Sequence, residues 1–262
     1  MRKDCVQLEE GRVGGQAHHQ GFPQFKERHR IFPAVFEDRR HRVILDLAAG
    51  VGYVTRRVLE KYPAKVVSHD ISPSCLGFLR NTGAPTVSFD IDHNEIAFPF
   101  ASGAFDAVIS LVTIEHVFFV DEFLQEIRRI LRPGGYLYLS TPNYAAPEYA
   151  IRPLLFGRSF HDPLSPSSRY EFYAHVRYFT SRTLFEFAAA KGFRLDAVYI
   201  ALPGGSARYQ ELYAASRLRA RAFRGLMALR HRLLSWKWAA EPVLCFQKAD
   251  ANKPHKFRKI LL

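Results

Sequence analysis

The sequence predicts an α/β fold: a Rossmann-like, mostly parallel, seven-stranded sheet with helices on both faces. Short apolar runs of strand length alternate with segments whose apolar residues recur at helical spacing, as in a parallel sheet with crossover helices. The first apolar run, 43–47, ends in a glycine-containing turn that leads into an amphipathic segment. With 262 residues, of which 48% are hydrophobic, the chain can bury such a core.

The individual elements follow from local signals. Strand 43–47 is a compact apolar run, and the helix after it, 54–62, ends at Pro63, which cannot continue a helix. The clearest helix is 121–131, where Asp121 is expected to cap the start, while arginines lie near the end and a proline with two glycines follows. The other expected strands are 65–70, 86–91, 105–112, 136–140, 194–202 and 243–248, and the other expected helices are 25–36, 74–79, one from 180 or 181 to 192, and 217–238.

We expect three regions along the chain. Residues 1–40 form a polar lead-in and a cap helix. Residues 41–202 form the core, with a proline-, serine- and aromatic-rich substrate cap at about 143–180. Residues 203–262 contain a basic helical segment, the last strand and a tail.

The turn after the first strand carries the strongest chemical signal. Small residues at positions 48, 50 and 52 let the backbone approach a ligand closely, and Asp70 ends the next strand, where a ribose-binding carboxylate belongs. A dinucleotide turn needs a third glycine, but Thr55 stands there, and the carboxylate of Asp46 would repel a pyrophosphate. The same charge would attract the amino group of S-adenosylmethionine, so the residues favour this sulfonium cofactor over NAD.

From residue 43 to about 143, and more weakly to 202, the chain resembles the class I S-adenosylmethionine-dependent methyltransferase superfamily, in its small-molecule and glycolipid branch. The family motif D-x-G-x-G-x-G is matched from Asp46 to Gly52, with Ala48 as a mild replacement of the first glycine, and 98–117 and 131–135 follow the family order. The resemblance implies S-adenosylmethionine as cofactor, contacted by Asp46, Ala48, Gly50, Gly52, Asp70, Ile71, Asp92 and Leu111. The family also places an acid beside the adenine amino group; Asp92 fits best, with Asp90 as the competing register.

Two histidines are candidates for the base that an oxygen acceptor usually needs. His116 follows the fourth strand, and His175 lies in a segment that resembles the family's H-x-R-x-F-T element, whose His and Arg order the substrate cap. We place His175 slightly ahead of His116, and either one also fits a hydrogen-bonded or packing role. In the cap, Arg152, Arg158 and Arg169 suit either an anionic acceptor group or a solvated basic surface.

The formal net charge of +12 favours an acidic partner. Within 217–238, apolar residues from Leu218 to Leu233 repeat at helical spacing among arginines, which suits either a helix on an anionic membrane surface or a helix packed on the core with a basic outer face. The three scattered cysteines predict neither a metal site nor a disulfide framework. Without a secretory signal or an apolar run of about 20 residues, we expect the protein in the cytoplasm, with membrane association left open.

These observations favour an S-adenosylmethionine-dependent methyltransferase that O-methylates a small molecule, lipid or glycoconjugate by in-line transfer. An RNA methyltransferase is one alternative, but a nucleic-acid acceptor is disfavoured, because 111–114 lack the [N/D]-P-P-[F/Y] motif of enzymes that methylate exocyclic base amines. A non-catalytic scaffold with the same fold is the other alternative. The intact glycine turn and Asp70 weigh against it, although a fold alone does not establish an activity.

Overall fold

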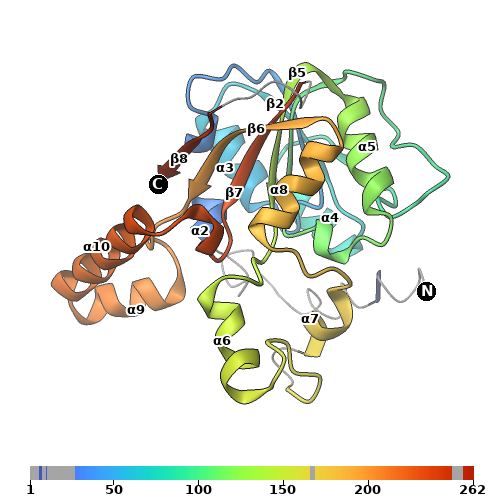
Figure 1. Cartoon of the computed structure of the whole chain (residues 1–262). Coiled ribbons are helices and arrows are strands. Elements are labelled where there is room, and N and C mark those ends of the chain that lie inside the picture. The colour runs from blue at the N-terminus through green and yellow to red at the C-terminus, as the bar shows by residue number, and fades with distance from the viewer. Residues whose placement is uncertain (1–5, 8–9, 11–26, 166–168, 250–255) are drawn as a thin grey trace.

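An eight-stranded sheet forms the centre of the protein in a computed structural model, which describes residues 6–7, 10, 27–165, 169–249 and 256–262 (Figure 1). The strand order is β3-β2-β1-β4-β5-β7-β6-β8. The strands are β1 (Val43–Asp46), β2 (Lys65–His69), β3 (Thr86–Val87), β4 (Phe105–Leu111), β5 (Leu131–Ser140), β6 (Phe193–Ile200), β7 (Val243–Lys248) and β8 (Arg258–Leu261).

Strands β1 to β5 pair in parallel, whereas β7 is antiparallel to both β5 and β6, and β8 is parallel to β6. The helices are α2 (Glu27–Arg30), α3 (Tyr53–Lys61), α4 (Pro73–Arg80), α5 (Val120–Ile130), α6 (Pro147–Phe156), α7 (Arg169–Ala174), α8 (Ser181–Ala190), α9 (Ala207–Ala215) and α10 (Arg217–Leu233), with the short helices η2 (Ala34–Phe36), η3 (Ile114–His116) and η4 (Trp236–Trp238).

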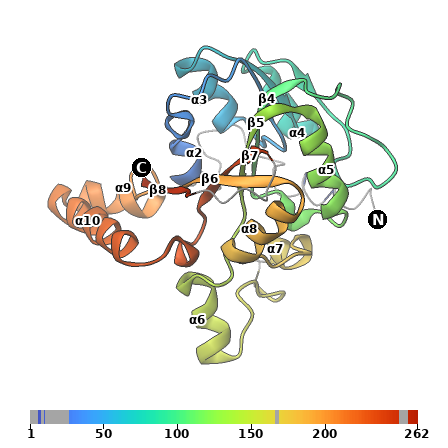
Figure 2. The ribbon, with the colours of Figure 1, turned by 45° about the horizontal axis from the view of Figure 1, so that its top comes forward.

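Both faces of the sheet are buried under helices. Helices α5 and α8 cover one face, and α2, η2 and α3 cover the other (Figure 2). Strand β7 shows how one apolar run serves both layers: Val243 and Cys245 pack on the α3 side, whereas Leu244 and Phe246 pack on the α5 side. A continuous apolar run is therefore the expected pattern for a strand at this depth.

The predicted fold class is confirmed, with one strand more than expected. Strand β8 has two basic residues in four and was too short and polar to stand out in the sequence. Strand β3 ends at Val87 rather than at residue 91, and within the described part of the chain it pairs with β2 alone. The prediction that Asp121 caps α5 is wrong: α5 begins at Val120, and Asp121 lies in its first turn, where its charge still favours the helix amino terminus.

Further boundaries differ from the expectation: the predicted helix 217–238 ends at Leu233, and the short η4 follows it. Helix 25–36 is interrupted in its described part, because α2 ends before Pro33 and the short η2 follows it; Phe25 and most of the lead-in to residue 22 lie outside the described residues. Strand β5 begins at Leu131, directly after α5, so the Pro-Gly-Gly sequence lies inside a bulged strand instead of before it.

Helix α6 and the α9–α10 pair extend away from the sheet (Figure 1). Helix α6 follows β5 and begins the region expected to form the substrate cap. Within the described ranges, we find no helix with the length and apolar character needed to cross a membrane.

Candidate functional site

The carboxyl ends of the parallel strands bring predicted cofactor residues to one edge of the sheet. Asp46 is the last residue of β1, Asp70 follows β2, and Leu111 ends β4. Strand β1 lies between β2 and β4, where the strand order reverses. Open α/β sheets bind their ligands at such a switch point, outside the carboxyl ends of the strands.

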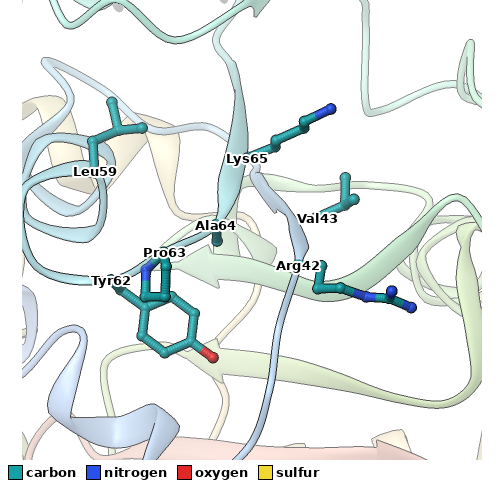
Figure 3. A pocket seen from close by; sticks show the side chains of 7 residues that line it. All are labelled: Arg42, Val43, Leu59, Tyr62, Pro63, Ala64 and Lys65. Atoms are coloured by element: carbon teal, nitrogen blue, oxygen red, sulfur yellow. The ribbon is translucent and has the colours of Figure 1, made fainter.

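A hollow at the opposite edge of the sheet is a separate feature (Figure 3). It lies at the amino ends of β1 and β2 and is lined by residues 42–43, Leu59 and 62–65. Since none of the predicted site residues lines it, we place the candidate site by the residues of the carboxyl edge.

The turn between β1 and α3 uses left-handed backbone at three positions, with φ of 55° at Ala48, 57° at Gly50 and 83° at Gly52. A non-glycine residue in this region costs about 1–2 kcal/mol, so the replacement of the first motif glycine by Ala48 is less mild than the sequence indicated. A Cβ on Gly52 would lie 2.9 Å from Leu79 Cδ2, whereas one on Gly50 would meet nothing within 4 Å. Gly52 therefore packs against α4, and Gly50 faces open space.

The carboxyl group of Asp46 is buried at the start of this turn. Its Oδ2 accepts a hydrogen bond of 2.6 Å from Thr55 Oγ1, which gives the residue at the third motif position a structural use. Burial raises the pKa of Asp46 to about 6, and the nearby charge of Asp70 adds to the rise, while the hydrogen bonds from Thr55 oppose it. A desolvated carboxylate of this kind is stabilised by an incoming cation.

Asp70 is fixed by two backbone amides. Its Oδ2 accepts a hydrogen bond of 2.8 Å from the N–H of Gly50, and its Oδ1 accepts one of 2.9 Å from the N–H of Ser72. Each carboxylate oxygen has a further lone pair for a ligand. Asp70 is therefore oriented by the same turn that leaves the open space at Gly50.

Sequence reasoning missed the role of His69, the last residue of β2, because no local pattern signals it. Its Nδ1 accepts a hydrogen bond of 3.2 Å from the N–H of Ala48, and its Nε2 lies 2.9 Å from the carbonyl oxygen of Phe89. This buried ring thus connects the glycine turn to the segment after β3. Burial lowers the pKa of His69, and the charges of Asp70 and Asp90 oppose that shift.

The two candidate adenine acids differ in their surroundings. Asp92 Oδ1 accepts hydrogen bonds from the backbone amides of Phe118 at 3.0 Å and Phe119 at 2.9 Å, so it connects the segment after β3 to the start of α5. Asp90 acts electrostatically on His69, beside the turn. Ile71 follows Asp70 and is half-buried, as is Leu111 at the end of β4.

Beyond β4 the chain bends sharply and buries a carboxyl group. Val112 has a φ of 56°, a strained conformation for a β-branched residue. Glu115 in η3 is fully buried; its Oε2 accepts a hydrogen bond of 3.0 Å from Thr141 Oγ1, and its carbonyl oxygen accepts bonds from the amides of Val176 and Arg177. Burial raises the pKa of the Glu115 carboxyl to about 8.

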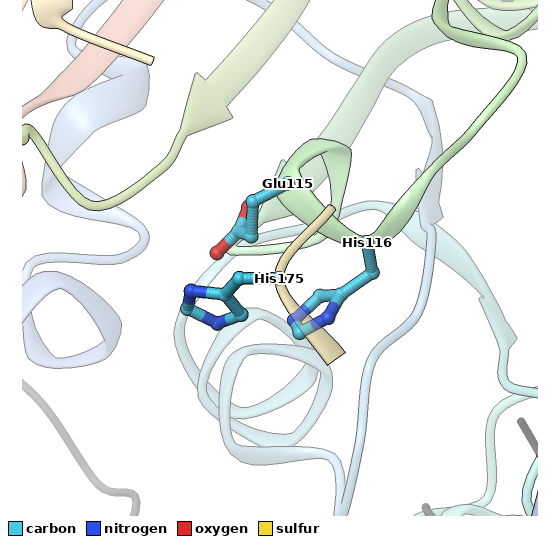
Figure 4. A group of neighbouring side chains, drawn as sticks. All are labelled: Glu115, His116 and His175. Atoms are coloured by element: carbon cyan, nitrogen blue, oxygen red, sulfur yellow. The ribbon is translucent and has the colours of Figure 1, made fainter. Parts of the chain in front are cut away.

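The structure brings the two predicted histidines together beside Glu115 (Figure 4). The rings of His116 and His175 lie 4.7 Å apart, edge to face. His116 Nδ1 is 3.0 Å from the carbonyl oxygen of Ala174, and His175 Nδ1 is 2.8 Å from the hydroxyl of Tyr144, which lies 2.9 Å from His161 Nε2. Burial, followed by the charges of His116 and His161, lowers the pKa of His175 to about 3, so this ring is neutral at physiological pH.

Sequence reasoning assigned no role to Glu115, Tyr144 or His161. These residues come from segments far apart in the chain, so no local spacing relates them. The arginines of the cap do not form a comparable cluster: Arg152 lies over the Phe160 ring at 6.0 Å, Arg158 is exposed, and the Arg169 side chain lies outside the described part.

Comparison with known proteins agrees with this architecture. Residues 45–139 match the family described as "Methyltransferase domain". A 164-residue stretch is 26% identical to a ubiquinone biosynthesis O-methyltransferase from Nitrosococcus oceani, covering 59% of this chain and 68% of that protein. A 101-residue stretch is 32% identical to a biotin biosynthesis bifunctional protein from Cellvibrio japonicus, covering 37% of this chain and 19% of that protein. The chain spans less than two thirds of the length of the first four curated relatives, from 3% to 59%.

Solved structures share the fold at low sequence identity. A SAM-dependent methyltransferase from Thermotoga maritima aligns with a TM-score of 0.57 and 14% identity, with 94% of each chain covered. A [4+2]-cyclase aligns with a TM-score of 0.56 and 18% identity, with 95% of each chain covered. Together with the family match, these findings confirm the predicted resemblance to S-adenosylmethionine-dependent methyltransferases. The cyclase shows that this fold also carries other chemistry.

Proposed function

We propose that this chain, a member of the class I S-adenosylmethionine-dependent methyltransferase superfamily, binds the cofactor at the carboxyl ends of β1, β2 and β4. We further propose that it methylates an acceptor held under residues 143–180. The observation that carries this proposal is the open space at Gly50, next to the oriented carboxylate of Asp70 and one strand away from the buried Asp46. An anionic turn without side-chain obstruction suits a ligand that has an ammonium group and ribose hydroxyls.

Different residues of the site are proposed to contact different parts of the cofactor. Asp46 pairs with the ammonium group of the methionine end, and Asp70 accepts hydrogen bonds from the ribose hydroxyls. Ile71 and Leu111, the half-buried residues at the strand ends, flank the ligand. For the adenine amino group we propose Asp92, the better fit in the sequence, whose Oδ1 is oriented by two backbone amides, with Asp90 as the competing residue.

The reaction is an in-line displacement. A lone pair of the acceptor oxygen forms the new O–C bond while the C–S bond breaks. The electron pair of the broken C–S bond stays on the sulfur, which changes from a positively charged sulfonium to a neutral thioether. The proton of the acceptor hydroxyl passes to a base, for which His175 is the first candidate and His116 the second. Burial keeps the His175 ring neutral, so a nitrogen lone pair is available, but the lowered pKa also makes this ring a weaker base than a free imidazole. Since the cofactor has a good leaving group, orientation and exclusion of water supply much of the rate.

For the acceptor we propose a small molecule with a hydroxyl group, including lipids and glycoconjugates. The similarity to a ubiquinone biosynthesis O-methyltransferase supports a small apolar acceptor. Aromatic side chains of the cap support it too, since the Tyr144 ring lies 5.2 Å from that of Tyr149 and 4.8 Å from that of Tyr178.

The proposal is tested by incubating the protein with methyl-labelled S-adenosylmethionine and separate quinol, glycolipid and RNA acceptors. We expect label in an organic-soluble acceptor and none with Asp70→Asn, which keeps the size of the side chain but loses its charge. Label in RNA alone would contradict the small-molecule acceptor. A protein that binds the cofactor but labels no acceptor, including those in a cell extract, would overturn the catalytic role and favour a scaffold.

We also propose that α10 and η4 make peripheral contact with an anionic membrane. The apolar stripe of α10 is exposed instead of packed on the core: Leu218 is 77% exposed, Leu226 64% and Leu233 76%. Arg219 and Arg221 are exposed on the same helix, so the surface combines leucines with positive charge. A helix of this composition lies in the interface of anionic lipids, and such contact would bring a lipid-linked acceptor to the enzyme.

The opposite side of α10 is anchored to the protein. Arg230 forms a salt bridge with Glu148 of α6 at 2.6 Å, Lys259 of β8 donates to the carbonyl of His231 at 2.7 Å, and Arg224 donates to the carbonyl of Pro203 at 2.6 Å. These contacts hold the helix with its leucines outward.

Membrane contact is measured by co-sedimentation with phosphatidylcholine vesicles that contain or lack phosphatidylglycerol. We expect binding only to the anionic vesicles and its loss in Leu226→Asp. Ile96→Asp is the matched control, because Ile96 has the same exposed fraction of 64% but lies outside α10. Equal sedimentation of the two variants would contradict the proposal.

A further inference from the structure

We propose that Glu115, His116 and His175 bind a divalent transition-metal ion. A ligand atom from each of the three side chains lies within 4.8 Å of the others, close enough for one ion to draw them together. The three come from two segments, η3 after β4 and the stretch between α7 and α8, and their side chains converge (Figure 4). The inference rests on the proposed function only for what the ion would do, not for its binding.

Both histidines are held by their Nδ1 atoms. A carbonyl oxygen only accepts hydrogen bonds, so the contact between His116 Nδ1 and Ala174 puts the proton of this ring on Nδ1 and leaves Nε2 as the basic nitrogen. His175 Nδ1 contacts the Tyr144 hydroxyl, and that hydroxyl also contacts His161 Nε2. When Nδ1 of His175 donates to Tyr144 and Tyr144 donates to His161, His175 likewise presents Nε2. Histidines that bind metals are usually oriented by such partners on the second nitrogen.

The carboxyl group of Glu115 is the second, independent observation. Its Oε2 accepts from Thr141, but Oε1 is buried and has no hydrogen-bond partner among the described residues. The side chain has 0% of its surface exposed. A buried polar atom without a partner costs free energy, and a cation bound to Oε1 would remove this cost.

The donor set indicates the kind of ion. Two imidazoles and one carboxylate suit zinc, cobalt, manganese or iron in the divalent state, whereas magnesium prefers oxygen ligands. Three protein ligands also leave a coordination position open. Under the proposed function, that position would take the acceptor oxygen and favour its deprotonated form, so that His116 and His175 would serve the acceptor through the ion instead of as free bases.

The experiment is a titration of chelator-treated protein with Co²⁺, followed by the visible absorption of the bound ion, with Zn²⁺ as competitor. We expect one equivalent to bind, Zn²⁺ to displace it, and Glu115→Gln to weaken binding roughly tenfold or more. Glu115→Gln retains the shape and the acceptor for Thr141, so it should fold. His231→Gln, at a buried histidine outside the cluster, should bind Co²⁺ like the wild type.

Two results would overturn the inference: no saturable Co²⁺ or Zn²⁺ binding by the folded wild type, or equal binding by Glu115→Gln. Either would make the cluster a hydrogen-bonded packing unit. Titration of the same chelated sample with S-adenosylmethionine separates this outcome from a failure of the proposed function, because the cofactor is assigned to different residues. Cofactor binding without metal binding would refute only the metal site, and metal binding without cofactor binding would refute only the cofactor site.

Discussion

Replacement of Gly50 by alanine should abolish most cofactor binding while leaving the protein folded. The new Cβ would meet no protein atom within 4 Å, so the cost to the fold is that of a left-handed alanine, about 1–2 kcal/mol. The methyl group would instead occupy the open space beside Asp70, which is 2.8 Å from the Gly50 amide. Loss of a hydrogen bond from a ribose hydroxyl to a charged group is worth about 1.5–3 kcal/mol, or roughly a 10- to 150-fold weaker Kd.

Gly83→Ala is the matched control for this experiment. Gly83 also has a positive φ, 82°, and a Cβ added to it would likewise meet nothing within 4 Å, but it lies before β3, at the amino edge of the sheet. Calorimetric titration with S-adenosylmethionine should show weak binding for Gly50→Ala and unchanged binding for Gly83→Ala, with both variants losing similar stability in urea. A folded Gly50→Ala protein that binds within about twofold of the wild type, a difference of only about 0.4 kcal/mol, would refute the placement of the cofactor at this turn.

Three further predictions concern stability and pH. Ala48→Gly should raise the free energy of unfolding in urea by roughly 0.5–1 kcal/mol, because it relieves the φ of 55°; a decrease would contradict this. Since ionised Asp46 attracts the ammonium group and its pKa is about 6, cofactor affinity should be flat above pH 6 and fall by about tenfold for each pH unit below it, and Asp46→Asn should bind weakly without this pH dependence. Burial, then the charge of Arg39, lowers the pKa of His41 to about 4, so below pH 6.5 His41 is protonated in the unfolded chain but not in the folded one. The stability of the wild type relative to His41→Gln should therefore fall by about 2 kcal/mol from pH 7 to pH 5, and an unchanged difference between the two proteins would contradict this.

The parts of the fold that the sequence predicted are those with a strong local pattern. Strand β7 has the predicted bounds, because burial on both faces requires an uninterrupted apolar run. Helix α8 begins at Ser181, one of the two predicted starts, and the side chain of Thr180 caps it. By contrast, α9 buries none of its residues, so it has no apolar stripe to reveal it, and β8 depends on pairing with β6 rather than on its own composition.

In the candidate site, too, some features were predicted from local sequence patterns and others were not. The glycine turn and its two acids are local motifs, and the topology places them at the carboxyl edge as expected. The environment of Glu115 could not be predicted, because Thr141 reaches it from the end of β5, and His175, which contacts Tyr144, comes from the cap. Their proximity is a property of the fold and not of any spacing along the chain. The strained backbone of Ala48 also could not be predicted, because its φ depends on the turn that the folded chain adopts.

The cofactor site is tested most directly by calorimetric titration of the wild-type protein with S-adenosylmethionine and with its demethylated product, beside Asp70→Asn. We expect saturable binding of both ligands to the wild type, with one ligand per chain and a clearly weaker affinity in the variant. Absence of binding of either ligand to a folded wild-type protein, or undiminished binding to Asp70→Asn, would contradict the assignment of this edge of the sheet as a cofactor site.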